Sequence, residues 1–302
     1  MSDHRLDSRV LENVRLAAGC GAAPAMLLVV ALASARPASV AEGVALLARM
    51  SERIQELHVA TPCPHQRLAE IEPELQSEPE LARMRLDVGD HELRGRLLFG
   101  ELLGQKSFLQ VAALAIAGVE LSAADAELLG HEGVLTQLAD VRIWPLAVTR
   151  RVSAGGGSLV EAVTAGLATL CTSQMAVTPV AGFMRFLAGL EHELGRGAAL
   201  EPLLRERLAS GERVLGIGRP LLGVDERVPP KLALAERYGR ASGRSMLLAR
   251  EIDRVVHDLK GVRVNSAGYQ GALLRDLGFS PEPAAAFCLL YFMVPVLAHA
   301  VF

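Results

Sequence analysis

Aromatic side chains are scarce in this chain. They make up 4% of its 302 residues, whereas hydrophobic residues of all kinds make up 51%. Sheets draw heavily on aromatic and β-branched side chains, while Ala and Leu, which must supply most of this core, are among the best helix formers. The composition therefore predicts an all-α protein of closely packed helices.

An excess of basic charge is also missing. The chain has 31 basic and 34 acidic residues, for a formal net charge of −3. A surface that binds nucleic acid or an anionic membrane needs a concentrated basic face. We therefore expect no nucleic-acid partner, although the balance leaves room for a local basic pocket.

Closely spaced cysteines are absent as well. The four cysteines form no CxxC pair, which argues against a zinc ribbon or a thioredoxin-type site, and Cys63-Pro64-His65 supplies at most half of a metal site. We expect no metal, and reduced thiols in a cytoplasmic protein. The cysteines are Cys20, Cys63, Cys171 and Cys288.

Uncharged stretches long enough to suggest a membrane span are interrupted. Residues 16–35 are mostly Ala and contain Gly19, Gly21 and Pro24, and residues 284–302 contain Pro295 and His299. A spanning helix needs about 20 strongly apolar residues. We expect both stretches to be helices buried in a helical core or subunit interface, with no membrane partner.

Helical patterns fill most of the chain. Residues 5–58 predict two or three helices, and residues 59–80, which are rich in Pro and Glu, predict a linker. Residues 87–96 predict a short extended turn. Further helices are predicted at residues 97–103, 107–117, from 122, 139–151, 158–170, 175–194, 200–209, from about 244 to 260, 270–277 and 284–302.

Three segments toward the C-terminus carry a family resemblance. They are Gly-Ile-Gly-Arg-Pro-Leu-Leu-Gly-Val-Asp-Glu-Arg (216–227), Lys-Gly-Val-Arg-Val-Asn-Ser-Ala-Gly-Tyr (260–269) and Ala298-His299. In this order and spacing they resemble the C-terminal third of citrate synthases and citryl-CoA lyases. The likeness extends over roughly residues 88–302 and is closest to the shorter, lyase-like members.

The resemblance implies a domain arrangement. We expect a large helical domain of residues 81–160 and 256–302 and a small helical domain of residues 160–255, with residues 1–80 as an additional helical segment that includes the linker. The family forms dimers with active sites near the interface between domains and subunits. A homodimer, or a heteromer with an active paralogue, is therefore expected.

The resemblance also implies a chemistry. In the family, an aspartate deprotonates the methyl group of an acyl-CoA and a histidine donates a hydrogen bond to the enolate. A second histidine polarises the carbonyl of an oxoacid, and arginines hold its carboxylates. These roles need a base of tuned pKa, donors aimed at the oxyanion and forked cations.

This chain departs from that pattern at the catalytic positions. The two histidines and the aspartate fall on Ala176, Arg219 and Ala267. An Asp-His pair in an upstream block of the family corresponds to Asp140-Val141 here. The family's carboxylate-binding arginine near the C-terminus corresponds to Phe292. Alanine can neither abstract a proton nor donate a hydrogen bond from its side chain.

Part of the family's binding segment is retained. Arg227 matches the arginine of the family's Asp-Pro-Arg sequence, and Gly216 and Gly218 match its glycine framework, which implies a cofactor-binding role for the two glycines. Arg219 could bind a carboxylate or a CoA phosphate, or it could form a salt bridge. Arg227 could keep the family role, or it could pair with Asp225.

Two further groups have a second interpretation. His299 matches a family position, but a buried, hydrogen-bonded histidine is the interpretation that we favour. Cys171, Ser173 and Gln174 could supply a replacement nucleophile or donor, but they have no His or Lys beside them in sequence.

Two functions of different class follow. The first is a non-catalytic protein, a pseudoenzyme that binds a CoA thioester or a di- or tricarboxylate, or that serves as a partner subunit. The alternative is a repurposed acyl-CoA enzyme, a lyase or acyltransferase that makes or breaks a carbon–carbon bond between a CoA thioester and a carboxylic acid. Whether the chain is an enzyme stays open, and no cofactor is required beyond that CoA thioester ligand.

Overall fold

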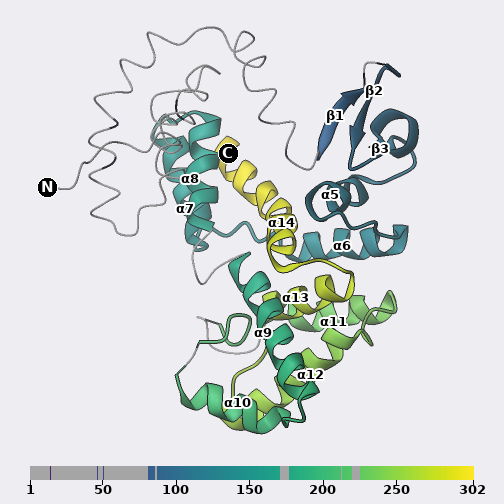
Figure 1. Ribbon diagram of the computed structural model, residues 1–302. Coiled ribbons are helices and arrows are strands. Elements are labelled where there is room, and N and C mark those ends of the chain that lie inside the picture. Colours follow the sequence, from purple (N-terminus) through teal and green to yellow (C-terminus); the bar gives the residue numbers. More distant parts are fainter. Residues whose placement is uncertain are drawn as a thin grey trace, which may run out of the picture. The chain divides into compact units, whose positions relative to one another are not determined.

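The computed structural model describes residues 14, 46, 50, 81–85, 87–170, 177–211, 213–219 and 225–302. The chain divides into two units, Met1–Glu80 and Leu81–Phe302, and the fold described below is that of the second unit (Figure 1). The helices and linker expected before residue 81, except at three isolated positions, lie outside the described residues.

The second unit begins with a small antiparallel sheet. Its strands are β1 (Ala82–Arg85), β2 (Asp90–Leu93) and β3 (Arg96–Leu97), in the order β1-β2-β3. The buried Asp90 carboxylate accepts the amides of Phe99 and Gly100, both at 2.9 Å, and so ties the sheet to the next turn. The sequence predicted only an extended turn at residues 87–96, because strands of two to four residues are too short for a visible alternation.

The segment after the sheet differs from its prediction. A helix was predicted at residues 97–103, but the structure has a single π-helical turn, η1, at Leu98–Leu102. π-Helices are rare and occur mostly as single turns. The chain straightens again at Leu103 before the first long helix.

Helices form the rest of the unit and make the fold all-α, as predicted (Figure 1). They are α5 (Phe108–Ala117), α6 (Ala123–Leu135), α7 (Trp144–Ala154), α8 (Leu159–Leu170), α9 (Thr178–Gly195), α10 (Leu200–Ala209), α11 (Val228–Arg237), α12 (Arg244–Lys260), α13 (Ser266–Asp276) and α14 (Pro281–Val301).

Side-chain caps explain where several helices begin. Ser107 and Gln110 form a capping box at the start of α5, and the Ser122 hydroxyl accepts the Asp125 amide at the start of α6, so both predicted starts are confirmed. Helix α13 begins at Ser266, earlier than the predicted residue 270, because the Asn265 side chain accepts the amides of Ala267 and Gly268.

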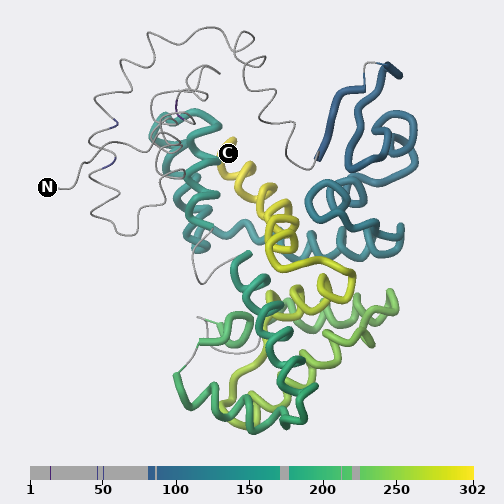
Figure 2. Tube along the Cα trace, viewed as in Figure 1, coloured from purple at the N-terminus to yellow at the C-terminus, as the bar shows by residue number. Residues whose placement is uncertain are grey.

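Helix α14 lies at the centre of the packing. It contacts α5, α7, α8, α9 and α13 (Figure 2), and the aromatic rings of Phe287 and Tyr291 on its inner face are buried. Within the described residues it is the one helix long and apolar enough, by length and composition, to cross a membrane. The extensive contacts of its inner face fit the core helix that the sequence predicted for residues 284–302.

Candidate functional site

A short loop, residues 216–219, is held against the segment that leads into α13. The Asn265 amide donates to the Gly216 carbonyl at 2.9 Å, and the Gly218 amide donates to the Arg263 carbonyl at 2.7 Å. The Asn265 side chain also donates to the Gly218 carbonyl at 2.6 Å. Two segments of the family resemblance, which are distant in sequence, therefore form one hydrogen-bonded unit.

Glycine is required at one position of this loop. Gly216 has a φ of +88°, and a Cβ there would lie 2.7 Å from the Phe183 ring. Gly218 has a φ of +72° but faces open space. Both residues have a left-handed backbone, which glycine adopts without steric cost. Only Gly216 is in addition packed against the core.

Asp225 is the buried anion of the site. Its carboxylate, 3% exposed, accepts two bonds of 2.8 Å from the Arg227 guanidinium and one of 2.9 Å from the Ser266 amide. Burial alone would raise the pKa of the Asp225 carboxyl, but these hydrogen bonds outweigh burial and lower it below its usual value. Asp225 therefore stays ionised and joins the start of α11 to the start of α13.

Arg219 lies on the same acid. One of its Nη atoms is 3.9 Å from the Asp225 carboxylate and 2.5 Å from the Glu226 carboxylate. The Glu226 side chain is 65% exposed, whereas that of Arg219 is 18% exposed. Two arginines and two acids thus form one cluster in which the formal charges balance.

The structure shows the ion-pair alternative for both arginines. Arg227 pairs with Asp225, and Arg219 pairs mainly with Glu226. A ligand-binding role for either residue stays a prediction. Any anion that binds here would compete with Glu226 more readily than with Asp225, because Glu226 is the exposed partner.

The residues that stand at the family's catalytic and binding positions lie in different parts of the structure. Ala267 lies in the first turn of α13, next to Ser266 and inside the hydrogen-bonded unit just described. Phe292 is partly buried against the main core, and Asp140 pairs with exposed Arg142, which lowers the pKa of Asp140 to about 2. Ala176 lies outside the described residues, as do Cys171, Ser173 and Gln174.

His299 has the structural role that we favoured. Its ring is 7% exposed, and Nε2 lies 2.7 Å from the Ala139 carbonyl oxygen. Among the residues that the structure describes, no cluster of three or more His, Cys, Asp or Glu side chains is arranged to hold a metal ion.

A second polar cluster was missed by sequence reasoning. Lys231 of α11 is buried, and its ammonium donates to Glu132 of α6 and, at 2.5 Å, to Gln270 of α13. Burial lowers the pKa of Lys231 to about 7, while contact with the Glu132 carboxylate favours the charged form. The one signal in the sequence was a lone lysine in an otherwise apolar stretch at residues 228–235.

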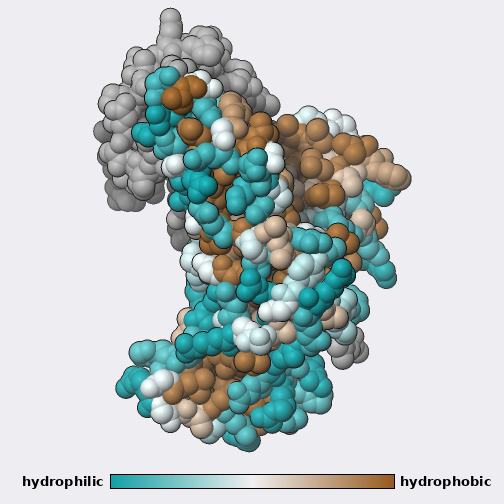
Figure 3. All heavy atoms as spheres, turned by 90° about the vertical axis from the view of Figure 1, so that its right-hand side faces the viewer, coloured by the Kyte–Doolittle hydropathy of each residue, from teal (hydrophilic) through white to brown (hydrophobic). Residues whose placement is uncertain are grey.

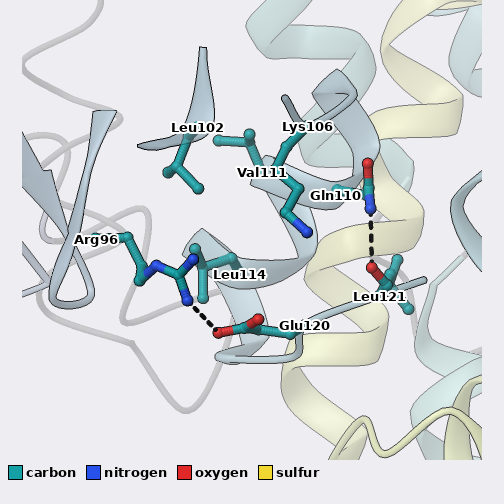
Figure 4. Close-up of a pocket in the computed structure, with 8 residues that line it drawn as sticks. All are labelled: Arg96, Leu102, Lys106, Gln110, Val111, Leu114, Glu120 and Leu121. Carbon is teal, nitrogen blue, oxygen red and sulfur yellow. Dashed lines mark hydrogen bonds and ion pairs between the residues drawn. The ribbon is translucent and has the colours of Figure 1, made fainter. Parts of the chain in front are cut away.

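A small hollow lies elsewhere, between η1 and α5. It has a volume of about 290 Å³ that includes space open to solvent. The Arg96 guanidinium donates to the Glu120 carboxylate at 3.2 Å, and the side-chain amide of Gln110 donates to the Leu121 carbonyl at 2.9 Å (Figure 4). No residue of the arginine cluster lines it; its lining is Arg96, Leu102, Lys106, Gln110, Val111, Leu114, Glu120 and Leu121.

Known structures share this fold. No protein-family model matches the sequence, and no curated protein matches it. Citryl-CoA lyase from Hydrogenobacter thermophilus is similar in structure, with a TM-score of 0.64, 20% identity and coverage of 74% of this chain and 85% of that chain. The protein therefore has the fold of citrate synthases and citryl-CoA lyases, as the resemblance implied.

Two more known structures are similar in fold. ATP citrate lyase from Methanothrix soehngenii, solved with citrate and coenzyme A, gives a TM-score of 0.60 at 16% identity over 88% of this chain. This chain spans 47% of that longer protein. Citrate synthase from the archaeon Thermoplasma acidophilum gives a TM-score of 0.50 at 12% identity, over 98% of this chain and 72% of that chain.

Proposed function

We propose that this protein is a ligand-binding protein of the citrate synthase fold that does not carry out the acid–base catalysis of its structural relatives. The proposed ligand is a CoA thioester or a di- or tricarboxylate. The proposed binding residues are Arg219 and Arg227, with the backbone of Gly216 and Gly218 shaping the site.

The position of Ala267 supports the absence of catalysis. It lies in the hydrogen-bonded unit that contains Asp225 and the glycine loop, where the resemblance places the catalytic aspartate. A general base contributes about 10²- to 10⁴-fold to the rate of proton transfer, and a methyl group supplies none of it. The buried carboxylate in that unit, Asp225, already accepts hydrogen bonds from Arg227 and the Ser266 amide.

The arginine cluster supports the ligand class. Guanidinium groups bind planar carboxylates and phosphates through two parallel hydrogen bonds. The exposed Glu226 already offers such a carboxylate to Arg219. The ATP citrate lyase structure contains citrate and coenzyme A, which favours the same ligand class for this chain.

Assembly with a second chain is part of the proposal. Val294, Leu297 and Val301 are exposed on α14, and their spacing places them on one face of the helix. An exposed apolar stripe of this kind favours a homodimer or a heteromer with an active paralogue. A cytoplasmic location is likewise proposed, from the widely spaced cysteines.

A repurposed acyl-CoA enzyme is the second candidate. The close approach of Arg219 and Arg227 through a shared Asp225 favours it, because two adjacent guanidinium groups can hold a polyanionic substrate during a reaction. Such an enzyme would have to use a base other than the residue at position 267.

Titration calorimetry of the purified protein with citryl-CoA, coenzyme A and citrate tests the proposal. We expect binding of at least one of them, and a loss of about tenfold in affinity in Arg219→Gln, the equivalent of about one charge-assisted hydrogen bond. Arg142→Gln is the control, because Arg142 also pairs with a carboxylate, that of Asp140, but does not belong to the arginine cluster. No binding by the wild type, or an equal loss in both variants, would refute this assignment.

A further inference from the structure

The buried cluster of Glu132, Lys231 and Gln270 joins three helices beside the arginine site. The exposed fractions of the three residues are 0%, 2% and 5%. The Lys231 ammonium donates to the Glu132 carboxylate from α6 and to the Gln270 carboxamide from α13. A buried charge costs free energy unless it is paired, so this arrangement needs an explanation.

The cluster lies one helical turn below the site on both helices. Lys231 is four residues after Arg227, the N-cap of α11, and Gln270 is four residues after Ser266, the first residue of α13. Residues four apart lie on the same face of a helix. Each helix therefore contacts Asp225 at its start. The second turns of the two helices meet through the Lys231–Gln270 hydrogen bond, and Lys231 of α11 also reaches Glu132 of α6.

Stability alone does not explain the cluster. Buried ion pairs are on average no more stabilising than well-packed apolar side chains of similar volume. Here Glu132 Oε1 and Gln270 Nε2 also lack a hydrogen-bond partner among the described residues. The pair is therefore incompletely satisfied, which lowers its net contribution to stability further.

Helix α14 adds no charge near the cluster that would compensate the Lys231 ammonium. Cys288 and Tyr291 of α14 are both buried, and burial raises the pKa of the Cys288 thiol to about 12 and that of the Tyr291 hydroxyl well above its usual value. Both groups are therefore neutral at physiological pH, and Glu132 is the one acid among the described residues that pairs with Lys231.

We infer that Glu132, Lys231 and Gln270 are positioning residues, which fix α11 and α13 in one register on α6 and thereby hold Arg227, Asp225 and the first turn of α13 in place. Directional hydrogen bonds allow one register, whereas apolar contacts allow neighbouring ones. The inference rests on the proposed function in that the positioned groups form the ligand site.

The test is the double variant Glu132→Leu/Lys231→Met. It removes both charges together, so that neither is left buried without its partner. Its control is Asp125→Asn/Arg240→Gln, which removes another ion pair of α6. That pair joins Asp125 to Arg240 in the loop after α11, with the Arg240 Nε and Asp125 Oδ1 atoms 2.6 Å apart. Both variants are compared with the wild type by urea unfolding, by hydrogen–deuterium exchange of residues 225–228 and 264–268, and by titration calorimetry with citrate.

We expect the Glu132/Lys231 double variant to unfold at a urea concentration close to or above that of the wild type. Exchange in residues 225–228 and 264–268 should nevertheless become about tenfold faster, since these first turns lose their fixed register. Citrate affinity should fall by a similar factor. The control variant should leave exchange and affinity at the wild-type level.

Unchanged exchange in a folded double variant would overturn the inference. If that variant does not fold, Gln270→Met decides, since it removes one hydrogen-bond partner without leaving a new charge; unchanged exchange there would also overturn the inference. A wild type that binds none of the ligands would refute the proposed function, but the exchange data would still decide the positioning role.

Discussion

At the scale of single residues, the arrangement around Asp225 is the main feature of the site. One buried carboxylate binds Arg227, accepts the Ser266 amide and approaches Arg219. A carboxylate that accepts several charged and backbone donors is held in its ionised form. Removing it would leave an arginine and a helix start without their shared acceptor.

Asp225→Asn should lower the free energy of unfolding by about 2 kcal/mol near neutral pH, the size expected for hydrogen bonds to a charged group. Because the folded pKa of Asp225 is lowered, this contribution is present above its unfolded pKa of about 3.9 and is lost as the pH falls through the folded value. Urea unfolding from pH 7 to pH 2 measures the difference between wild type and variant, which should shrink below pH 4.

Asp140→Asn is the control, since Asp140 pairs with an arginine that is 89% exposed. Its effect at neutral pH should be much smaller than that of Asp225→Asn, because solvent screens an ion pair with an exposed arginine. An equal loss in the two variants, or a difference between wild type and Asp225→Asn that does not shrink below pH 4, would contradict the role assigned to Asp225.

Some site residues could be predicted from the sequence and others could not. Arg219 and Arg227 were identified by their glycine and proline neighbours and by the order of the surrounding segments. Lys231, Glu132 and Gln270 were not, because charged and amide side chains within a helical pattern are expected to face solvent. Only the packing of α6, α11 and α13 shows that these three meet.

At the scale of elements, the loop at residues 216–219 sets the approach of α9 to the segment before α13. Gly216 and Gly218 both have a positive φ, but only Gly216 is packed against Phe183. This difference allows the effect of backbone strain to be separated from the effect of close packing.

Gly218→Ala should therefore destabilise the protein by about 1 kcal/mol, the cost of a left-handed alanine. Gly216→Ala should cost about 3 kcal/mol, since overpacking against a buried ring is added to that strain. Urea unfolding of the two variants measures both values. Equal losses would show that the contact between Gly216 and Phe183 is unimportant.

Two predicted helix starts lie within one residue of the structure. Helices were predicted from residues 107 and 122, and α5 and α6 begin directly after Ser107 and Ser122, which cap them. Helix α7 was predicted from residue 139, yet it begins at Trp144, because Asp140 folds the preceding residues into a turn by accepting the amide and guanidinium of Arg142. The strands β1 to β3 were not predicted, because they are too short to show an alternating pattern.

At the scale of the whole molecule, composition and the order of weak motifs were enough to predict the all-α fold. Scarce aromatics pointed to helices, and the spacing of the segments at 216–227 and 260–269 pointed to the citrate synthase fold that the comparisons show. The division of residues 81–302 into a large and a small domain stays a prediction.

Apolar surface also belongs to this scale. Figure 3 faces the side of the β1–β3 sheet and shows apolar surface gathered in its upper part. Phe99, Leu103 and Phe108 are exposed in the segment that follows the sheet. Together with the exposed face of α14, this apolar surface is more extensive than singly scattered apolar residues would give. It supports the proposal that the protein assembles with a second chain.

The central claim is that this chain retains the fold of its structural relatives without their proton-transfer chemistry. The most direct measurement is the release of free coenzyme A thiol when the purified protein is mixed with citryl-CoA, and separately with acetyl-CoA and oxaloacetate. The account predicts a rate no higher than that of buffer, even at ligand concentrations at which calorimetry detects binding. Thiol release by the wild type that Arg219→Gln abolishes and Arg142→Gln preserves would contradict it.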